Sequence, residues 1–238
     1  MAKNNYFRFK QFLINQERAA MKVGTDGVLL GAWANVAGVS KILDIGAGTG
    51  LIALMMAQRS KAKITGIEIE KNAAEEAAKN VSASPWKNRV KIQNISFQDF
   101  VNSCSELFDL VVSNPPFFTK SRKPESAHLA AAKHDDLLPL PFLVQNVGKL
   151  LSENGRFAVI IPAGAANDFL KNAENARLFL IRETAVRPNN LKKVHRYLME
   201  FSKKESEPEK DNLNIHTDDG TDFTESYKMI TRDFYLNF

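Results

Sequence analysis

Two short segments carry residues whose types and spacing could do chemistry. The first is 44–50, Asp-Ile-Gly-Ala-Gly-Thr-Gly, which follows an apolar strand-like stretch and leads into a helix-like one. A strand, a glycine turn and a helix in this order place backbone N–H groups and a positive helix end at the carboxyl edge of a sheet, where nucleotide-like cofactors bind. The second is 114–117, Asn-Pro-Pro-Phe. Two consecutive prolines fix the backbone and remove two N–H donors, which leaves carbonyl groups as acceptors.

The glycine turn has rivals among other nucleotide-binding loops. A dinucleotide fingerprint needs its third glycine where this chain has Leu51, and no Lys-Ser/Thr pair follows as in a Walker loop. A purely structural turn also fits the glycines alone. The apolar stretch 63–69, however, carries Glu68 about 20 residues beyond the turn, where a carboxylate can accept hydrogen bonds from both hydroxyls of a ribose. We therefore predict a nucleotide-like cofactor bound by the following residues: Asp44, Gly46, Ala47, Gly48, Gly50 and Glu68.

Alternating strands and helices are expected to position these residues. Segments typical of strands are 42–45, 63–69, 90–92, 108–113 and 156–161, and helix-like segments lie at 51–58, 71–82 and 137–151. This alternation favours an α/β fold with a parallel sheet and helices on both faces. In the last third, 177–184 and 195–202 can pair as antiparallel strands.

Three segments near the end of the chain complete this expected organisation. The charged, proline-containing run 203–211 is expected to be a mobile loop. The weakly alternating segment 212–216 is a candidate edge strand. An apolar stripe over 223–238 predicts a C-terminal helix that closes the core. We see no second hydrophobic core, so we expect one domain over 1–238.

Composition narrows the class of protein. The chain has 238 residues, a net charge of +5 and a pI of about 9.2, which fit either an ordinary surface or an acidic partner such as nucleic acid. A single cysteine, Cys104, excludes an intramolecular disulfide and fits a reducing compartment. We find no signal peptide, no run long enough to cross a membrane and no metal-ligand spacing, so we expect a cytoplasmic protein without a metal.

The segment 44–50 together with Glu68 resembles the first motif and the acidic second strand end of class I S-adenosylmethionine-dependent methyltransferases. The resemblance implies a Rossmann-like, mostly parallel sheet of seven strands in the order 3-2-1-4-5-7-6, with strand 7 antiparallel, and S-adenosylmethionine as the cofactor. In that family an Asp after the third strand often contacts the cofactor adenine. That position falls at Ser96, with Phe97 next, and Asp99 is a nearby alternative.

The segment 114–117 resembles the Asn-Pro-Pro-aromatic motif of methyltransferases that modify a planar amino or amide nitrogen. An adenine N6 is a poor nucleophile because its lone pair is delocalised into the ring. The side-chain oxygen of Asn114 and the carbonyl of Pro115 can accept its two N–H bonds, and catalysis then needs positioning rather than a strong base. Pro116 keeps this backbone rigid, and Phe117 can stack on a flipped base. The alternative is a rigid structural turn.

Four further stretches resemble the bacterial tRNA1(Val) (adenine(37)-N6)-methyltransferase family: Phe9-Lys10-Gln11-Phe12, residues 21–33, Ser84-Pro85-Trp86 and Phe234-Tyr235-Leu236. This resemblance implies methyl transfer to N6 of the adenine 3′ of the anticodon, and a tRNA anticodon stem-loop as partner. It also implies that residues 1–35 form an extension lining the cofactor site, with Lys22, Thr25 and Asp26 at the cofactor's amino-acid end. We expect a monomer or weak dimer.

Two other functions remain open from the residues themselves. Protein-glutamine methyltransferases that act on release factors carry a similar Asn-Pro-Pro-Tyr motif, and a non-catalytic tRNA-binding module could use the same fold. Basic residues in 119–124 and 187–196 could contact phosphates or could be ordinary solvated charges.

Overall fold

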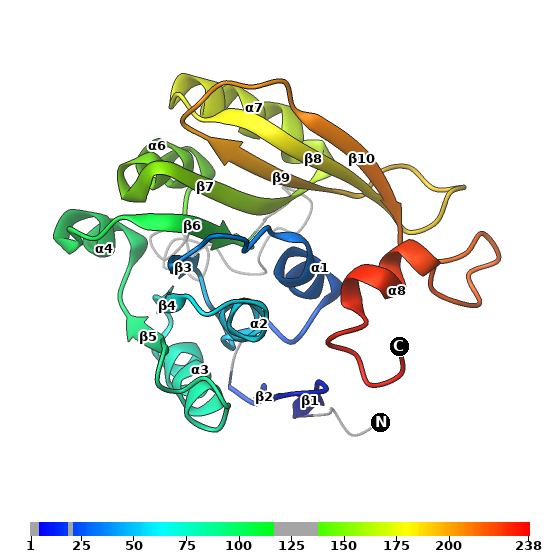
Figure 1. Cartoon of the computed structure of the whole chain (residues 1–238), viewed down its shortest axis with the longest axis horizontal. Helices are drawn as coiled ribbons and strands as arrows, with labels where there is room; N and C mark the ends of the chain where they lie inside the picture. Colours follow the sequence, from blue (N-terminus) through cyan, green and yellow to red (C-terminus); the bar gives the residue numbers. More distant parts are fainter. Residues whose placement is uncertain (1–4, 19–20, 117–137) are drawn as a thin grey trace, which may run out of the picture.

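The computed structural model describes residues 5–18, 21–116 and 138–238, and its centre is a mixed eight-stranded sheet (Figure 1). The strands are β3 (Lys41–Ile45), β4 (Lys63–Glu68), β5 (Val90–Asn94), β6 (Phe108–Ser113), β7 (Leu151–Pro162), β8 (Phe179–Arg187), β9 (Arg196–Ser202) and β10 (Glu209–Asn214). Their order is β10-β8-β9-β7-β6-β3-β4-β5. The strands β3 to β9 thus follow the predicted order 3-2-1-4-5-7-6, which confirms the expected Rossmann-like α/β fold.

The strand count was wrong by one. Strand β10 adds an eighth, parallel neighbour to β8 at the edge of the sheet, while β9 runs antiparallel to both β7 and β8. It overlaps the candidate edge strand 212–216 but begins at Glu209, inside the run 203–211 that we expected to be a mobile loop. Its first four residues are exposed and charged or polar, as edge strands often are, so hydrophobicity does not mark it.

Each face of the sheet packs on its own helices (Figure 1). Helices α1 (Thr25–Trp33), α2 (Leu51–Arg59) and α3 (Lys71–Ser82) lie on one face, and α4 (Phe97–Ser103), α6 (Leu140–Leu150), η1 (Ala163–Ala165) and α7 (Ala166–Asn175) lie on the other. Successive side chains of a strand point to opposite faces. On β3, accordingly, Ile42 joins the core with α1 and α2, while Leu43 joins the core with α6 and α7. Among the described residues no helix is long and apolar enough to cross a membrane.

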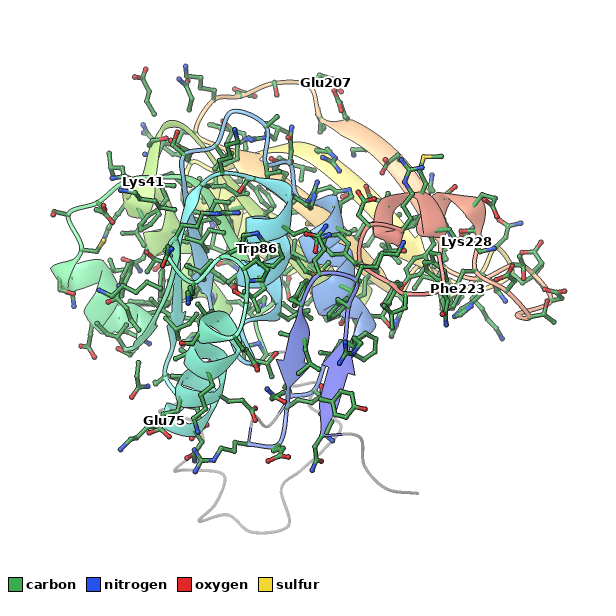
Figure 2. All side chains as sticks on the ribbon, turned by 60° about the horizontal axis from the view of Figure 1, so that its bottom comes forward. Lys41, Glu75, Trp86, Glu207, Phe223 and Lys228 are labelled. Atoms are coloured by element: carbon green, nitrogen blue, oxygen red, sulfur yellow. The ribbon has the colours of Figure 1, made fainter. Side chains whose placement is uncertain are left out.

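The two ends of the described chain pack against each other. The N-terminal hairpin of β1 (Tyr6–Arg8) and β2 (Leu13–Asn15) places Phe9 against Tyr235, with ring centroids 6.0 Å apart. The ammonium of Lys10 donates to the backbone oxygen of Phe238 at 2.8 Å. Helix α8 (Glu225–Thr231) lies close to the C-terminus, and Figure 2 labels its residue Lys228 and the nearby Phe223.

The C-terminal helix is shorter than predicted, because only Glu225–Thr231 of the segment 223–238 is α-helical. Thr224 begins it as an N-cap, its side chain accepting from the backbone N–H of Tyr227. After Thr231 the chain turns, and Phe234 still reaches the core. Apolar spacing marked the buried residues correctly but did not mark where the helix ends.

Helix α1, which leads out of the N-terminal extension, is anchored at its far end. The indole N–H of Trp33 donates to the hydroxyl of Thr184 on β8 at 2.7 Å, and the guanidinium of Arg182 lies 3.8 Å above the indole ring. Its other end has Gly24 as N-cap without a side-chain hydrogen bond, so neither Thr25 nor Asp26 caps the helix. Both side chains are instead helical residues at the site described below.

Close packing of α1 on α2 yields a stability prediction. A Cβ added to Gly31 would lie 2.5 Å from the sulfur and 3.0 Å from the Cβ of Met55. Gly31→Ala should therefore lower the free energy of unfolding by about 1–3 kcal/mol through overpacking. The matched control is Gly148→Ala in α6, where the nearest atom is 3.9 Å away, and the gain in helix propensity should raise stability by up to about 1 kcal/mol. Urea unfolding measures both; equal shifts in the same direction would contradict the packing argument.

Candidate active site

The glycine turn is tied to the neighbouring strand β4 by its backbone. The N–H groups of Gly46 and Ala47 both donate to the carbonyl oxygen of Ile67, at 3.0 and 2.9 Å. Gly46, Gly48 and Gly50 all have positive φ angles, of 74°, 54° and 81°, which glycine adopts without strain. A Cβ at Gly46 or Gly48 would meet no atom within 4 Å, so these two glycines border open space.

Glu68 continues this connection. Its carboxylate accepts from the backbone N–H of Gly48 at 2.9 Å through Oε2, and from that of Glu70 at 2.9 Å through Oε1. Each carboxylate oxygen has two lone pairs, so each can accept a further hydrogen bond. Glu68 is half-buried at the end of β4, and its acceptor capacity faces a cavity.

The Asn-Pro-Pro motif follows β6, the neighbour of β3 on the other side. The buried hydroxyl of Ser113 donates to the carbonyl oxygen of Ile45 at 2.9 Å, which ties the end of β6 to the start of the glycine turn. Asn114 is half-buried and Pro115 is buried. The two motifs, 64 residues apart when counted from Gly50 to Asn114, therefore lie side by side at the carboxyl edge of the sheet.

Two cavities meet at these motifs. The first, here called the Glu68 cavity, has about 940 Å³ of open space, and its lining includes Glu68, Ile69, Ile95, Phe97, Gln98, Pro115 and Pro116. The second, the Arg196 cavity, has about 1220 Å³, and its lining includes Lys22, Thr25, Asp26, Ala47, Arg187, His195 and Arg196. Gly46, Gly48 and Asn114 line both. The site thus has two compartments with Asn114 and the glycine turn at their shared wall.

The Arg196 cavity contains an ion pair that joins helix α1 to strand β9. Arg196 Nε donates to Asp26 Oδ2 at 2.8 Å, with 22% and 33% of the two side chains exposed. The same guanidinium contacts the ring and the carbonyl oxygen of its neighbour His195. A carboxylate and a guanidinium side by side offer complementary partners to a ligand that carries both charges.

The N-terminal extension is fastened across this site by α3. The buried carboxylate of Glu76 accepts from the backbone N–H groups of Glu17 and Arg18 at 2.7 and 3.0 Å. The amide of Asn80 donates to the carbonyl oxygens of Asn15 and Thr49, both at 2.9 Å. Because Thr49 belongs to the glycine turn, Asn80 connects that turn directly to the extension, and residues 21–27 then line the Arg196 cavity.

Most of the predicted site residues are brought together, but three lie elsewhere. Asp44 is fully buried beneath the turn, where its Oδ2 accepts from the backbone N–H of Ala53 in α2. Gly50 packs toward Ala77 of α3 rather than into a cavity. Ser96 is the N-cap of α4, bonded to Asp99. None of the three lines either cavity, and their assignment to the cofactor stays a prediction.

Other lining residues were not foreseen, and one prediction cannot be placed. Gln98, the second residue of α4, and Ile69, which directly follows β4, border the Glu68 cavity, and no motif marks them. Arg196 was noted only as one of several basic residues, because its partner Asp26 is 170 residues away in the chain. Phe117 lies outside the described residues, as does the basic segment 119–124.

The fold and this site together define a class I methyltransferase. Residues 23–163 match the family model of the methyltransferase small domain. A predicted O-methyltransferase from Agrobacterium tumefaciens has a similar fold, with a TM-score of 0.68 and 17% identity over 88% of this chain and 96% of that one. A ribosomal protein L11 methylase from Lactobacillus delbrueckii is also similar, with a TM-score of 0.57 and 13% identity over 80% of this chain and 84% of that one.

Within that class, this chain belongs to the tRNA1(Val) (adenine(37)-N6)-methyltransferase family, which confirms the resemblance seen in the sequence. The protein of that name from Trichodesmium erythraeum is 47% identical over 98% of this chain and 99% of its own length. Its counterpart from Escherichia coli is 38% identical over 98% and 96%.

The buried Asp44 yields a prediction about pH. Burial raises the pKa of Asp44 from 3.8 to about 7, helped by the nearby Glu68 carboxylate and opposed by the Ala53 hydrogen bond. Since the folded protein favours the protonated acid, ionisation of Asp44 removes stability as the pH rises from about 4 to about 7. Asp44→Asn abolishes this titration. From about pH 5 to about pH 8, the unfolding free energy of the variant should therefore rise relative to that of the wild type.

Asp109 provides the control for this measurement. Burial raises its pKa, but hydrogen bonds from Ser40, Lys41 and Ser152 outweigh that effect and hold the pKa below its usual value. Its stabilisation is lost only as the pH falls, so the deficit of Asp109→Asn should stay constant between about pH 5 and about pH 8. Urea unfolding at several pH values tests both. A constant difference for Asp44→Asn as well would contradict a raised pKa for Asp44.

Proposed function

We propose that this protein transfers a methyl group from S-adenosylmethionine to N6 of adenine 37, the base 3′ of the anticodon, in a valine tRNA. The observation that carries the proposal is that Asn114 lies on the shared wall of two cavities, next to the glycine turn. The adenosine part of a donor fits the Glu68 cavity and its amino-acid end reaches into the Arg196 cavity, which also has room for an acceptor beside Asn114. The substrate named for the relatives in this family supports the choice of tRNA.

The residues of the site fit S-adenosylmethionine as the donor. Two glycines with positive φ border open space, and the Glu68 carboxylate keeps acceptor capacity for ribose hydroxyls. Phe97 and Gln98 supply an apolar face and an amide for the adenine. At the amino-acid end of the donor, Asp26 supplies a carboxylate for the donor's ammonium group, and Lys22 and Thr25 supply hydrogen-bond donors for its carboxylate. The glycine-turn residues Gly46, Ala47 and Gly48 line the same cavity.

When bound, S-adenosylmethionine supplies an electrophilic methyl group on a positively charged sulfur. The chain itself holds the acceptor nitrogen. Asn114 Oδ1 and the Pro115 carbonyl accept the two N–H bonds of N6, which orients its lone pair and raises its electron density. Transfer of the methyl group would break its bond to sulfur and leave a neutral thioether, while N6 would become cationic and release one proton to water. No side chain is needed as a strong base, because the proton leaves an already cationic nitrogen.

Two alternatives use the same geometry. A protein-glutamine acceptor presents a similar planar amide to Asn114, and a non-catalytic tRNA-binding module would bind RNA without consuming the donor. Two arginines that line the Arg196 cavity, Arg187 and Arg196, favour an RNA acceptor, since guanidinium groups can contact phosphates. We further propose that the protein works in the cytoplasm, where its tRNA substrate is found, as a monomer or weak dimer.

Glu68→Ala tests the donor site. Loss of the carboxylate should weaken S-adenosylmethionine binding by about 1.5–3 kcal/mol, the usual value of hydrogen bonds to a charged group. The matched control is Glu75→Ala, an exposed glutamate on α3 that is labelled in Figure 2 and should leave affinity unchanged. Isothermal titration calorimetry measures both variants. An unchanged affinity for Glu68→Ala would remove this residue from the cofactor site.

Asn114→Ala tests the acceptor site. The variant should lose at least about 100-fold in single-turnover methylation, because the amino group is no longer oriented, while it keeps its affinity for the donor. Asn154→Ala, at the opposite edge of the sheet, should retain full activity. Rapid-quench assays with labelled donor give the rates, and calorimetry gives the affinity. A near wild-type rate for Asn114→Ala would show that the assigned mechanism is wrong.

A further inference from the structure

The turn between β8 and β9, residues 188–195, is a feature that donor binding does not explain. Its two ends, Pro188 and His195, line the Arg196 cavity together with the adjoining strand residues Arg187 and Arg196. Asn114 lines the same cavity. The turn therefore extends outward from the compartment in which the acceptor would meet Asn114.

The backbone of this turn is held in place from both sides. Within it, the N–H of Lys192 donates to the carbonyl oxygen of Asn189 at 3.2 Å, and the N–H of His195 donates to that of Val186 at 2.9 Å. From the neighbouring loop, Asp218 Oδ1 accepts from the N–H of Asn190 at 3.2 Å. A turn with these bonds presents its tip side chains on a pre-organised backbone, which lowers the entropic cost of binding a partner.

The tip of the turn carries a leucine where turns usually carry small or polar residues. Leu191 is 73% exposed, more than any other large hydrophobic side chain in the described ranges 5–18, 21–116 and 138–238. A single exposed leucine is ordinary by itself. This one is followed directly by Lys192 and Lys193, both exposed and without an ion pair to any residue that the structure describes.

An apolar tip with adjacent unpaired cations suits one kind of partner. Lysine ammonium groups contact nucleic-acid phosphates, and apolar side chains that insert beside a base keep neighbouring bases unstacked. Single-stranded RNA loops are recognised through such unstacked bases. An adenine whose N6 is to reach Asn114 has to leave its stack first.

We propose that the turn 188–195 is an RNA-contacting element of the acceptor site. Lys192 and Lys193 contact phosphates of the loop that carries the target adenine. Leu191 packs against a base beside that adenine and thereby keeps the adenine out of the stack. This proposal rests on the proposed function, since it assigns the surface through which the tRNA loop reaches Asn114. It makes Leu191 a positioning residue, with no contact to the donor.

The test compares two variants with matched controls. The variants are Leu191→Ser and the double substitution Lys192→Ala/Lys193→Ala. The controls are Leu107→Ser, another exposed leucine at 50%, and Lys61→Ala/Lys63→Ala, two exposed lysines at the opposite end of the sheet. Donor affinity and thermal unfolding should be unchanged in all four, because the substituted side chains are exposed and line neither cavity.

The lysine pair is tested by binding of tRNA at a series of salt concentrations. The double variant should bind about 10-fold more weakly at low salt, and its plot of log affinity against log salt should be less steep by about 1–2, roughly one for each phosphate contact. The control pair should match the wild type.

Leu191 is tested by base unstacking and by turnover. A tRNA with 2-aminopurine at the target position should gain fluorescence with the wild type and much less with Leu191→Ser, at unchanged salt slope. Methylation of normal tRNA should fall about 10-fold, whereas an unstructured single-stranded oligonucleotide should be methylated equally by both proteins. Leu107→Ser should match the wild type throughout.

The outcomes separate this proposal from the function on which it rests. If the wild type methylates tRNA while the turn variants behave as their controls do, the proposal is wrong and the proposed function stands. If tRNA binds and is methylated normally but a protein partner binds only the wild-type turn, the surface serves another interaction and the proposal is again overturned. Failure of the wild type to methylate any tRNA would overturn the proposed function itself.

Discussion

The site depends on the alignment of three neighbouring parallel strands, whose carboxyl ends meet at one edge of the sheet. Backbone N–H groups of the glycine turn after β3 donate to Ile67 on β4, and Ser113 at the end of β6 donates to Ile45. Glu68 completes the connection through Gly48. A one-residue shift in any of these pairings would point the side chains at the strand ends to the other face. The donor loop and the acceptor motif therefore share one geometry because they share one hydrogen-bonded edge.

Segments from both ends of the chain then enclose that edge. The N-terminal extension is fixed by Glu76 and Asn80 of α3, and the β8–β9 hairpin reaches it through the pair of Arg196 with Asp26. The hydrogen bonds that hold the extension join the side chains of Glu76 and Asn80 to its backbone, so they fix its position without a second hydrophobic core. The Arg196 cavity is consequently built in part from the N-terminal extension and the β8–β9 hairpin, and it is the more basic of the two cavities.

The sequence was most informative where a local pattern has a single physical cause. The alternation of Ile42 and Leu43 follows from two buried faces, and the strand order followed from the family resemblance, which the sheet confirms. The motifs at strand ends follow from the need for glycine and for acceptor groups, and Glu68 and Asn114 do line the cavities, while their roles stay predictions. Strand β10 was only partly foreseen, as the candidate edge strand 212–216, because pairing with β8 rather than hydrophobicity makes its first residues a strand. The role of Arg196 was missed because its partner is distant in sequence. Ser96 is the cap of α4, a role for which a hydroxyl is as well suited as for a ligand contact.

The central claim is that one edge of the sheet passes a methyl group from the donor to an adenine N6 in tRNA. The most direct test supplies the purified protein with S-adenosylmethionine labelled in the methyl group, together with unmodified tRNA and, separately, with a release factor, followed by nucleoside and amino-acid analysis of the products. The account predicts label in N6-methyladenosine alone, at the base 3′ of the anticodon of a valine tRNA. Label in glutamine of the release factor, or binding of tRNA with no label transferred, would contradict it.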